Sequence, residues 1–440
     1  MCETLLDQLT TDSSTHNNNK PTAPQINDER RTALTLLCDL IKIDSQNDHE
    51  AKVALCLQKF LASYGIASEL VEFCEGRSSL VAEIHNGDGK TLAISGHLDV
   101  VSAGDANLWT HPPFSAHIDD DGVLWGRGAS DMKSGLAALV IAMIHLNETK
   151  NFSGTIRLLA TVGEEVGEYG SQQLTKLGYM DDVDGLLIAE PCNVGIIHAH
   201  KGSLNYKVIA KGVAAHSSMP ELGNNAIEQL NTAMTQIITD IRTKAATITN
   251  PLLGNTLHNI TLIQGGTQVN SIPDHAEFEA NARTVPEYDN QAVIQDIQAI
   301  IDTLNAQDGY ELSLIVTADQ PPVYAAPDSP LIHSIINSTK DLPRLQVPYL
   351  LDSMGRVLNQ DLSTLSQKFP KGLAPITASG TTDAAQFLRH RDDIDLAIYG
   401  PGIPMLNHKI DERINIGQYF DFIDVYQVII ANYLDGTLSD

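Results

Sequence analysis

The chain contains few cysteines, no long apolar run and no basic leader. Only five of its 440 residues are cysteine, and none forms a Cys-x-x-Cys pair, so we expect reduced thiols rather than disulfides. No stretch approaches the roughly 20 apolar residues that a bilayer span needs. The first residues lack the basic-then-apolar order of a signal peptide. These absences favour a cytoplasmic protein. The cysteines are Cys2, Cys38, Cys56, Cys74 and Cys192.

Positive charge is also scarce. The chain has 28 Lys and Arg against 55 Asp and Glu, which gives a formal net charge of -27. Such a charge repels nucleic acid and anionic lipid, so we expect neither nucleic acid nor a membrane as a partner. An anionic substrate would need local positive charge at its binding site.

The remaining composition is that of an ordinary globular protein, with 42% hydrophobic and 19% charged residues. A length of 440 residues suits two domains. We expect a mobile N-terminal tail over residues 1–28, because residues 10–28 are rich in Ser, Thr, Asn and Pro. After the tail, helical patterns alternate with apolar strands, which predicts an α/β fold. Helices are expected at 28–43, 49–64 and 134–146, and strands at 80–84, 92–95, 156–162 and 186–189.

The pattern changes near residue 202. Strands at 205–210, 256–263, 276–282 and 312–317 and helices at 225–242 and 291–304 give the order βαββαβ. This order predicts a small ferredoxin-like α+β domain over 202–317, inserted into a first domain made of 29–201 and 318–440. A helix at 383–391 and a strand at 396–399 are expected after the insertion.

Potential metal ligands stand where the predicted elements end. His97 and Asp99 follow the apolar strand at 92–95, and Asp131 precedes the apolar helix at 134–146. In an extended segment, residues two apart point the same way, so one of the first pair can ligate while the other orients the imidazole. Each signal is weak alone, because a His-x-Asp triplet arises by chance and Asp131 could simply cap its helix.

Three further acidic residues and a histidine share this placement. Glu164 and Glu165 follow the apolar strand at 156–162, and Glu190 follows the strand at 186–189. His408 comes just after the strand at 396–399. Adjacent glutamates can divide two tasks, one as a metal ligand and the other as a proton carrier. A solvated helix face is the alternative for such a pair, but the flanking glycines argue against it.

These residues lie in motifs that resemble those of the M20 zinc amidohydrolases and peptidases. This family includes acetylornithine deacetylase, succinyl-diaminopimelate desuccinylase, aminoacylase and carboxypeptidase G, and the resemblance spans about residues 32–434. It implies a mixed-sheet catalytic domain and an inserted lid and dimerisation domain. The motifs are Ser95-Gly96-His97-Leu98-Asp99, Gly126-Arg127-Gly128-Ala129-Ser130-Asp131, Gly163-Glu164-Glu165, Ala189-Glu190-Pro191 and Asn407-His408.

The resemblance also implies a role for each of these residues. His97 and Glu190 would bind one Zn²⁺, Glu165 and His408 would bind a second, and Asp131 would bridge the two. Glu164 would act as the catalytic base, and Asp99 would orient His97. Co²⁺ or Mn²⁺ would be possible substitutes for Zn²⁺.

A second group of implied residues concerns the substrate and a partner subunit. His216 matches the lid motif, in which the histidine comes from the partner of a homodimer and stabilises the oxyanion. Asn270, Arg283, Gly380 and Thr381 match substrate-binding positions, with Arg283 suited to a carboxylate. Without the resemblance, His216 would be a surface histidine, Arg283 a solvated strand-edge residue, and the 379–383 segment a simple helix cap.

The resemblance favours hydrolysis of an N-acyl amino acid, and N-succinyl-diaminopimelate in the lysine pathway is the preferred substrate. Acetylornithine deacetylase, a dipeptidase or tripeptidase, and a scaffold without catalysis remain alternatives. A free α-ammonium would require an acidic residue in the site, which a deacylase does not need. A succinyl carboxylate would require an extra cation, for which Arg127, Lys133 and Lys201 are the candidates.

Overall fold

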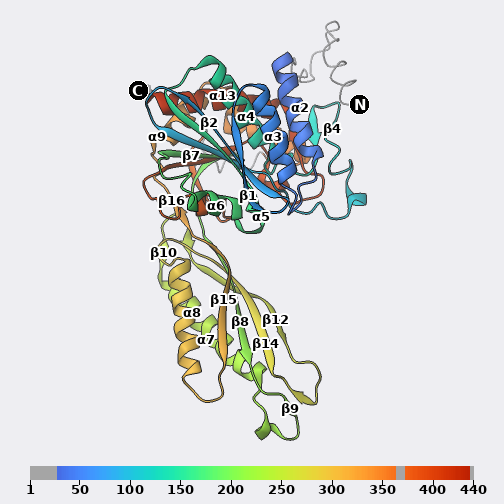
Figure 1. Cartoon of the computed structure of the whole chain (residues 1–440), viewed down its shortest axis with the longest axis vertical. Helices are drawn as coiled ribbons and strands as arrows, with labels where there is room; N and C mark the ends of the chain where they lie inside the picture. The colour runs from blue at the N-terminus through green and yellow to red at the C-terminus, as the bar shows by residue number, and fades with distance from the viewer. Residues whose placement is uncertain (1–26, 363–371, 437–440) are drawn as a thin grey trace. The chain divides into compact units, whose positions relative to one another are not determined.

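The computed structural model describes residues 27–362 and 372–436. They form two compact units (Figure 1): the first combines the described residues up to His198 with those in 325–376 and 391–440, and the second combines Ala199–Tyr324 with Thr377–His390. The predicted tail lies outside the described residues except at its end. There Asn27 caps helix α2, accepting a hydrogen bond from the Arg30 amide at 2.9 Å.

A mixed sheet organises the first unit. Its strand order is β1-β2-β6-β3-β7-β16, and β17 and β18 also pair with β7. Strand β3 runs parallel to β6 and β7, and β18 is parallel to β7, whereas β1, β2 and β6 pair in antiparallel fashion. The strands are β1 (Ser68–Cys74), β2 (Arg77–Asn86), β3 (Thr91–His97), β6 (Gly154–Thr161), β7 (Gly185–His200), β16 (Val323–Tyr324), β17 (Pro375–Ala378) and β18 (Asp395–Gly400).

Helices pack on this sheet and on one another. Helix α4 contacts β3, α2 and α13, while α3 contacts β2 and α9 contacts β18. The longer helices are α2 (Asp28–Lys42), α3 (Ala51–Ser63), α4 (Lys133–Thr149), α6 (Tyr169–Lys176), α9 (Pro330–Thr339), α10 (Val347–Leu358) and α13 (Ile416–Asp435). Shorter elements are η1 (Ala106–Leu108), α5 (Glu164–Gly167), η3 (Pro343–Leu345), η4 (Pro404–Leu406) and the small sheet of β4 (His117–Ile118), β5 (Val123–Trp125) and β19 (Arg413–Asn415).

The apolar runs of the sequence explain the centre of this unit. All seven residues of β3 are buried, as expected for a parallel strand covered on both faces. Every residue of α4 from Lys133 to Ile144 is also buried. A strand and a helix without a solvent-exposed face are typical of the middle of a layered fold. Packing on all sides therefore holds β3 and α4 in place, together with the residues at their ends.

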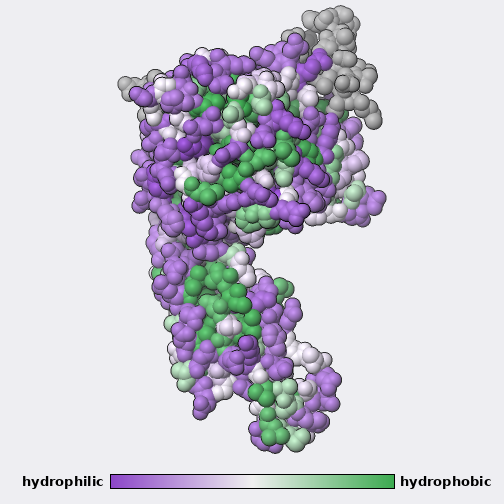
Figure 2. All heavy atoms as spheres, viewed as in Figure 1, coloured by the Kyte–Doolittle hydropathy of each residue, from purple (hydrophilic) through white to green (hydrophobic). Residues whose placement is uncertain are grey.

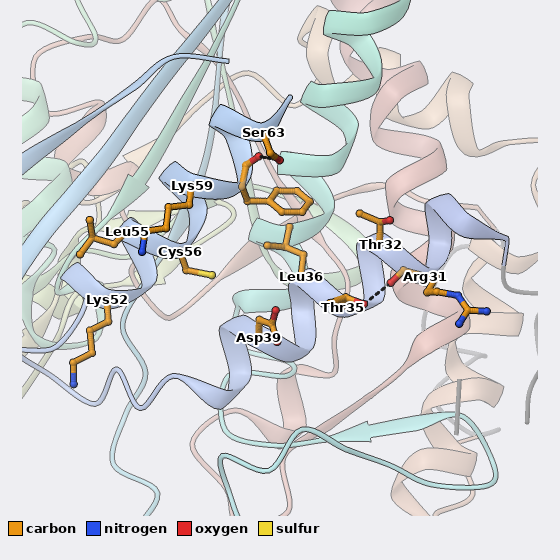
Figure 3. Close-up of a pocket in the computed structure, with 11 residues that line it drawn as sticks. Arg31, Thr32, Thr35, Leu36, Asp39, Lys52, Leu55, Cys56, Lys59 and Ser63 are labelled. Carbon is orange, nitrogen blue, oxygen red and sulfur yellow. Dashed lines mark hydrogen bonds between the residues drawn. The ribbon is translucent and has the colours of Figure 1, made fainter. Parts of the chain in front are cut away.

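A surface groove of about 750 Å³ separates α2 from α3 (Figure 3). Its lining combines apolar side chains such as Leu36 and Phe60 with the cations Arg31, Lys52 and Lys59. None of the predicted site residues lines this groove.

The second unit is a four-stranded antiparallel sheet with two helices. The strand order is β12-β14-β8-β15 and the chain order is βαββαβ, which is the ferredoxin-like arrangement expected from the sequence. Its main elements are β8 (Ser203–Lys211), α7 (Ala226–Thr247), β12 (Leu257–Gly265), β14 (His275–Arg283), α8 (Asn290–Asn305) and β15 (Leu312–Gln320). The smaller ones are β9 (Ala215–His216), η2 (Pro220–Leu222), β10 (Thr249–Asn250), β11 (Gly254–Asn255), β13 (Ser271–Ile272) and α12 (Ala384–Phe387).

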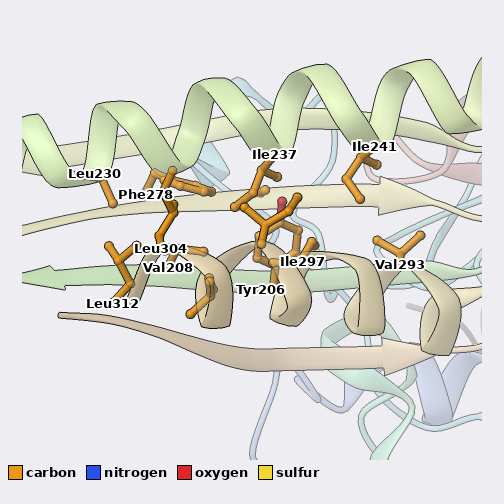
Figure 4. Close-up of a cluster of buried hydrophobic side chains, with 14 of the residues drawn as sticks. Tyr206, Val208, Leu230, Ile237, Ile241, Phe278, Val293, Ile297, Leu304 and Leu312 are labelled. Carbon is orange, nitrogen blue, oxygen red and sulfur yellow. The ribbon is translucent and has the colours of Figure 1, made fainter. Parts of the chain in front are cut away.

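Alternating side chains build the core of the second unit. Buried and wetter positions alternate along β8 and β14, as in a sheet covered on one face. Figure 4 shows apolar side chains of α7, such as Ile237, and of α8, such as Ile297, packed over Tyr206 and Phe278 of the sheet. The helices therefore cover one face of the sheet and leave its edge strands available.

The structure differs from the predicted boundaries after residue 376. Segment 377–390 was predicted to belong to the first domain, but it packs with the second unit. Arg389 pairs with Asp319 at 3.0 Å and the Gln386 amide donates to the Asp319 carbonyl at 3.0 Å. The helix expected at 383–391 is shorter in the structure, where α12 covers Ala384–Phe387.

The inserted segment begins and ends in neighbouring strands. Val323 of β16 lies opposite His200 of β7, and Tyr324 lies opposite Ala199. Among the described residues, no helix is long and apolar enough to cross a membrane. Figure 2 shows hydrophobic residues gathered over the second unit, in the region where Figure 1 draws α8 and β15.

Candidate metal centre

His97 is the last residue of β3 and its ring is buried. Its Nδ1 atom lies 2.9 Å from the main-chain carbonyl oxygen of Asp99, which can only accept a hydrogen bond. The neutral ring therefore carries its proton on Nδ1 and presents the lone pair of Nε2. That atom faces Asp131 Oδ1 at 3.2 Å and Glu190 Oε1 at 3.6 Å.

Asp99 makes contacts that the sequence did not predict. Its carboxylate is 3.7 Å from His97 Nδ1, farther away than its own carbonyl oxygen. The two carboxylate oxygens instead accept the backbone N–H groups of Glu164 at 3.2 Å and Glu165 at 3.1 Å. Asp99 thus joins the end of β3 to the acidic pair that follows β6.

Asp131 does not cap the helix that follows it. Helix α4 begins at Lys133, its N-cap is Met132, and no side chain makes a capping hydrogen bond. The capping alternative is therefore wrong. The buried Asp131 carboxylate points its Oδ1 at His97 Nε2 and its Oδ2 at His408 Nε2, the latter at 3.7 Å. One carboxylate thus faces two imidazoles from distant parts of the chain.

Glu164 and Glu165 begin the short helix α5 directly after β6. The preceding Gly163 has a φ of 66°, and a Cβ atom there would lie 2.6 Å from Arg77 Nη2, so only glycine fits. This turn brings Glu165 Oε2 to 2.9 Å from His408 Nε2. The alternative of a solvated helix face is wrong for Glu165, whose side chain is largely buried.

Glu190 does not end its strand, contrary to the sequence prediction. Strand β7 continues to His200, and Glu190 lies within it. The pairing of β7 with β3 stops at Ile188, so Pro191 can follow without costing a hydrogen bond to that neighbour. The Glu190 carboxylate therefore lies beside the His97 ring, with Oε1 3.6 Å from Nε2, although the strand continues past it.

The described residues contain two overlapping sets of potential ligand atoms within 4.8 Å of one another: His97, Asp131 and Glu165, and His97, Glu164 and Glu190. Burial disfavours a charged imidazole, but neighbouring carboxylates, led by Glu190, raise the pKa of His97 well above its usual value. The hydrogen bond from Glu165 raises the pKa of His408. Carboxylates outnumber imidazoles here, so the donor set fits divalent cations.

Comparison with known proteins identifies the family. Residues 93–432 match the family described as Peptidase family M20/M25/M40, and this range includes all of the potential metal ligands described above. The chain belongs to this family. A curated relative from Staphylococcus aureus (strain MSSA476), named probable succinyl-diaminopimelate desuccinylase, is 39% identical over 425 residues, which cover 91% of this chain and 97% of the relative.

Solved structures with the M20 fold resemble most of the chain. The M20 family metallo-carboxypeptidase Sso-CP2 from Sulfolobus solfataricus has a TM-score of 0.69 at 18% identity, and the match covers 93% of this chain and 99% of that one. The Bacillus subtilis YXEP protein, described as a dinuclear metal binding peptidase from the M20 family, has a TM-score of 0.62 at 16% identity, with coverages of 92% and 98%. The predicted family and the two-domain α/β fold with a mixed sheet are confirmed. This M20 protein is a hydrolase of amide bonds from a metal-dependent family.

Sequence reasoning missed Glu412, four residues after His408. It is fully buried and accepts hydrogen bonds from the Arg127 guanidinium at 2.6 Å and from the Asp131 amide at 2.9 Å. An acidic pair, Asp411-Glu412, was the available signal.

Two of the three cations proposed to bind a succinyl carboxylate make hydrogen bonds to other residues of the first unit. Arg127 is held by Glu412, and Lys133 donates to the Leu40 and Ile43 carbonyls, each at 2.9 Å.

The second unit brings His216 and Asn270 together. His216 ends β9, which pairs with β13, and the Ser217 amide donates to the Asn270 carbonyl at 3.1 Å. The exposed His216 ring accepts the Ser218 backbone N–H on Nδ1 at 3.2 Å, so its neutral form carries the proton on Nε2. That nitrogen is then the donor that an oxyanion would need.

Arg283 and segment 380–382 each interact with His200. Burial, together with the positive charge of Arg283, lowers the pKa of His200 to about 4. Thr382, which follows Gly380 and Thr381, has its Oγ1 atom 3.3 Å from His200 Nε2. Lys201, the third proposed cation, donates to the Asn255 carbonyl at 2.5 Å.

Proposed function

We propose that this M20 hydrolase removes the succinyl group from N-succinyl-diaminopimelate. The observation that carries the proposal is the 39% identity, over nearly the full length of both chains, to a relative named probable succinyl-diaminopimelate desuccinylase. The reaction hydrolyses one amide bond and releases succinate and diaminopimelate. It would place the protein in lysine biosynthesis in the cytoplasm.

The proposed metal site would hold two Zn²⁺ ions. His97 and Glu190 would supply ligands for the first and Glu165 and His408 for the second, and Asp131 would be shared between them. Supporting this division, each oxygen of Asp131 faces a different imidazole, and each of those imidazoles has its own glutamate partner. When bound, the ions supply Lewis acidity for the amide carbonyl and lower the pKa of water to about 7.

The chain's own residues then handle protons and charge. Glu164 takes a proton from the attacking water and passes it to the nitrogen of the leaving amine. Its position supports this role, because the Asp99 carboxylate accepts its backbone N–H at 3.2 Å and its carboxylate lies within 4.8 Å of the ligand atoms of His97 and Glu190. The Nδ1–H bond of His97 to a carbonyl keeps Nε2 available as a ligand.

The substrate carboxylates require separate cations. We propose Arg283, together with backbone N–H groups of Gly380 and Thr381, for one carboxylate, and the Asn270 side chain for a neighbouring polar group. The common proximity of Arg283 and segment 380–382 to His200 supports this grouping. The buried hydrogen bonds of Arg127 and Lys133 argue against either as the succinyl-binding cation.

We also propose a homodimer formed through the second unit, in which His216 stabilises the oxyanion in the partner's site. The edge strands of the four-stranded sheet support this proposal. Leu262 and Ile263 of β12 are 53% and 61% exposed, and Ile315 of β15 is 45% exposed. Exposed apolar side chains on sheet edges are characteristic of surfaces that pair with another chain.

A substrate screen tests the proposed function. Protein loaded with Zn²⁺, Co²⁺ or Mn²⁺ is assayed for amine release from N-succinyl-diaminopimelate, N-acetylornithine, simple N-acyl amino acids, and blocked and unblocked dipeptides. We expect the highest kcat/KM for the succinyl substrate. A higher kcat/KM for N-acetylornithine would show that the enzyme removes an acetyl group from acetylornithine, by the same amide hydrolysis. Preference for unblocked peptides would instead show a peptidase.

A further inference from the structure

Glu412 joins two loops that carry proposed metal ligands. Its Oε1 accepts the backbone N–H groups of Ser130 at 2.8 Å and Asp131 at 2.9 Å. Its Oε2 accepts the Gly128 amide at 3.1 Å and the Arg127 guanidinium at 2.6 Å. One fully buried carboxylate therefore holds the 127–131 segment at four points.

The same residue belongs to the loop of His408. Its neighbours fix that loop elsewhere: Asp411 accepts the Thr110 amide and hydroxyl, both at 2.8 Å, and Arg413 lies 4.5 Å above the Trp125 ring. The side chains of Asp411 and Arg413 thus contact Thr110 and Trp125, whereas the Glu412 side chain contacts the 127–131 segment that carries Asp131. The separation between Asp131 and His408 thus depends on where the Glu412 carboxylate sits, together with the hydrogen bond that the Ile403 amide donates to Ser130 Oγ at 2.7 Å.

We propose that Glu412 is a positioning residue that sets the separation of Asp131 and His408 and thereby the metal affinity of the centre. This inference rests on the proposed metal site. Both carboxylate oxygens of Glu412 face N–H donors, so a group that offers one acceptor and one NH₂ cannot satisfy both sides. A residue one methylene shorter cannot reach the segment from the same backbone position.

Two variants test the inference. Glu412→Gln keeps the size of the side chain but turns an NH₂ group toward N–H donors, and Glu412→Asp keeps the charge but shortens the reach. The metal-free proteins are titrated with Zn²⁺ by calorimetry, and the visible spectrum of Co²⁺ reports the coordination geometry. We expect both variants to bind at least one ion about tenfold more weakly, with an altered Co²⁺ spectrum, as for other residues that orient ligands.

A control separates positioning from a loss of stability. Ile430→Ala removes a fully buried side chain from α13, away from both loops, so it should lower the melting temperature and leave Zn²⁺ affinity unchanged. If folded Glu412→Gln, or Glu412→Asp should the first variant not fold, binds Zn²⁺ and Co²⁺ like the wild type, the inference is overturned. If the wild type itself binds no metal, the proposed site fails first.

Discussion

The Nε2 atom of His408 lies 2.9 Å from Oε2 of Glu165. The two residues come from segments far apart in the first unit's sequence, one after β6 and the other after η4. Such a contact between an imidazole and a largely buried carboxylate defines one half of the proposed centre. The other half is formed by His97 and Glu190, and Asp131 reaches toward both.

The acidic pair after β6 allows a test of two roles on adjacent residues. Glu164→Gln should reduce kcat by about 10²–10⁴-fold, because it removes the proton carrier, and should leave Zn²⁺ stoichiometry unchanged. Glu165→Gln should lose metal. Steady-state kinetics and metal analysis of the purified variants check both expectations. Loss of metal from Glu164→Gln would show that this residue is a ligand and not the base.

Metal binding should weaken on acidification. Carboxylate neighbours raise the pKa values of His97 and His408 in the metal-free protein, so protons compete for these nitrogens at higher pH than for an ordinary histidine. Zn²⁺ affinity should therefore fall steadily between about pH 8 and about pH 6, with proton release on binding. Calorimetry in buffers of different ionisation enthalpy measures both quantities. A constant Zn²⁺ affinity over this pH range would contradict the assignment of imidazole ligands.

Removal of the metal gives a separate test. A chelator should abolish activity, and added Zn²⁺ should restore it.

Asp99→Asn tests the link between β3 and the acidic pair. The amide offers one acceptor where the carboxylate offers two, so either the Glu164 or the Glu165 amide loses its partner. An unsatisfied buried N–H costs about 1–3 kcal/mol, and we expect the free energy of unfolding to fall by that amount. Turnover should fall about 10–100-fold because the base is displaced. Wild-type kcat in a folded Asp99→Asn protein would remove Asp99 from the catalytic machinery.

His216 permits a complementation experiment. His216→Ala should lower kcat far more than it raises KM, because an oxyanion contact acts in the transition state. If the histidine serves the partner's site, mixing inactive His216→Ala and Glu164→Ala subunits should restore about a quarter of the wild-type activity, since half the dimers are mixed and each has one intact site. Mixtures that stay inactive after verified subunit exchange would place the histidine in its own subunit's site or outside catalysis.

Lys133 should make stability depend on pH. Burial lowers its pKa to about 7, whereas in the unfolded chain it is about 10.4. Between these values the unfolded state binds more protons, so the wild type gains stability as the pH rises through this window. Relative to Lys133→Met, the free energy of unfolding should increase from about pH 7 to about pH 10. Urea unfolding at several pH values measures the difference. A pH-independent difference would mean that the pKa is not lowered.

Local patterns predicted the parts of the fold that depend on neighbours in sequence. The uninterrupted apolar runs of β3 and α4 identified a central layer, and the alternation in β8 and β14 identified a half-exposed sheet. The candidate ligands were found in a similar way, because acidic residues and histidines that directly adjoin an apolar run can be read from the local sequence.

Long-range pairing explains what the sequence did not reveal. The strand predicted at 186–189 was expected to end before Glu190, but β7 continues to His200 and pairs with β18 and β16 after its pairing with β3 stops at Ile188. Helix α12 ends at Phe387, and Arg389 beyond it pairs with Asp319, which is far away in sequence. The acidic pair Asp411-Glu412 is visible in the sequence, but the role of Glu412 emerges from its hydrogen bonds to residues 127–131. No local pattern encodes such partners.

The paired stem of β7 and β16 makes residues 201–322, the larger part of the second unit, a removable cassette. Because His200 and Val323 are direct neighbours, a two-residue turn could close the gap if the intervening stretch were deleted. All proposed ligands would remain in the shortened polypeptide, since each lies before residue 199 or after 390. Nature or an engineer could therefore exchange this stretch, and with it the proposed partner surface, Asn270 and Arg283, while Gly380, Thr381 and the proposed ligands stay in the remaining chain.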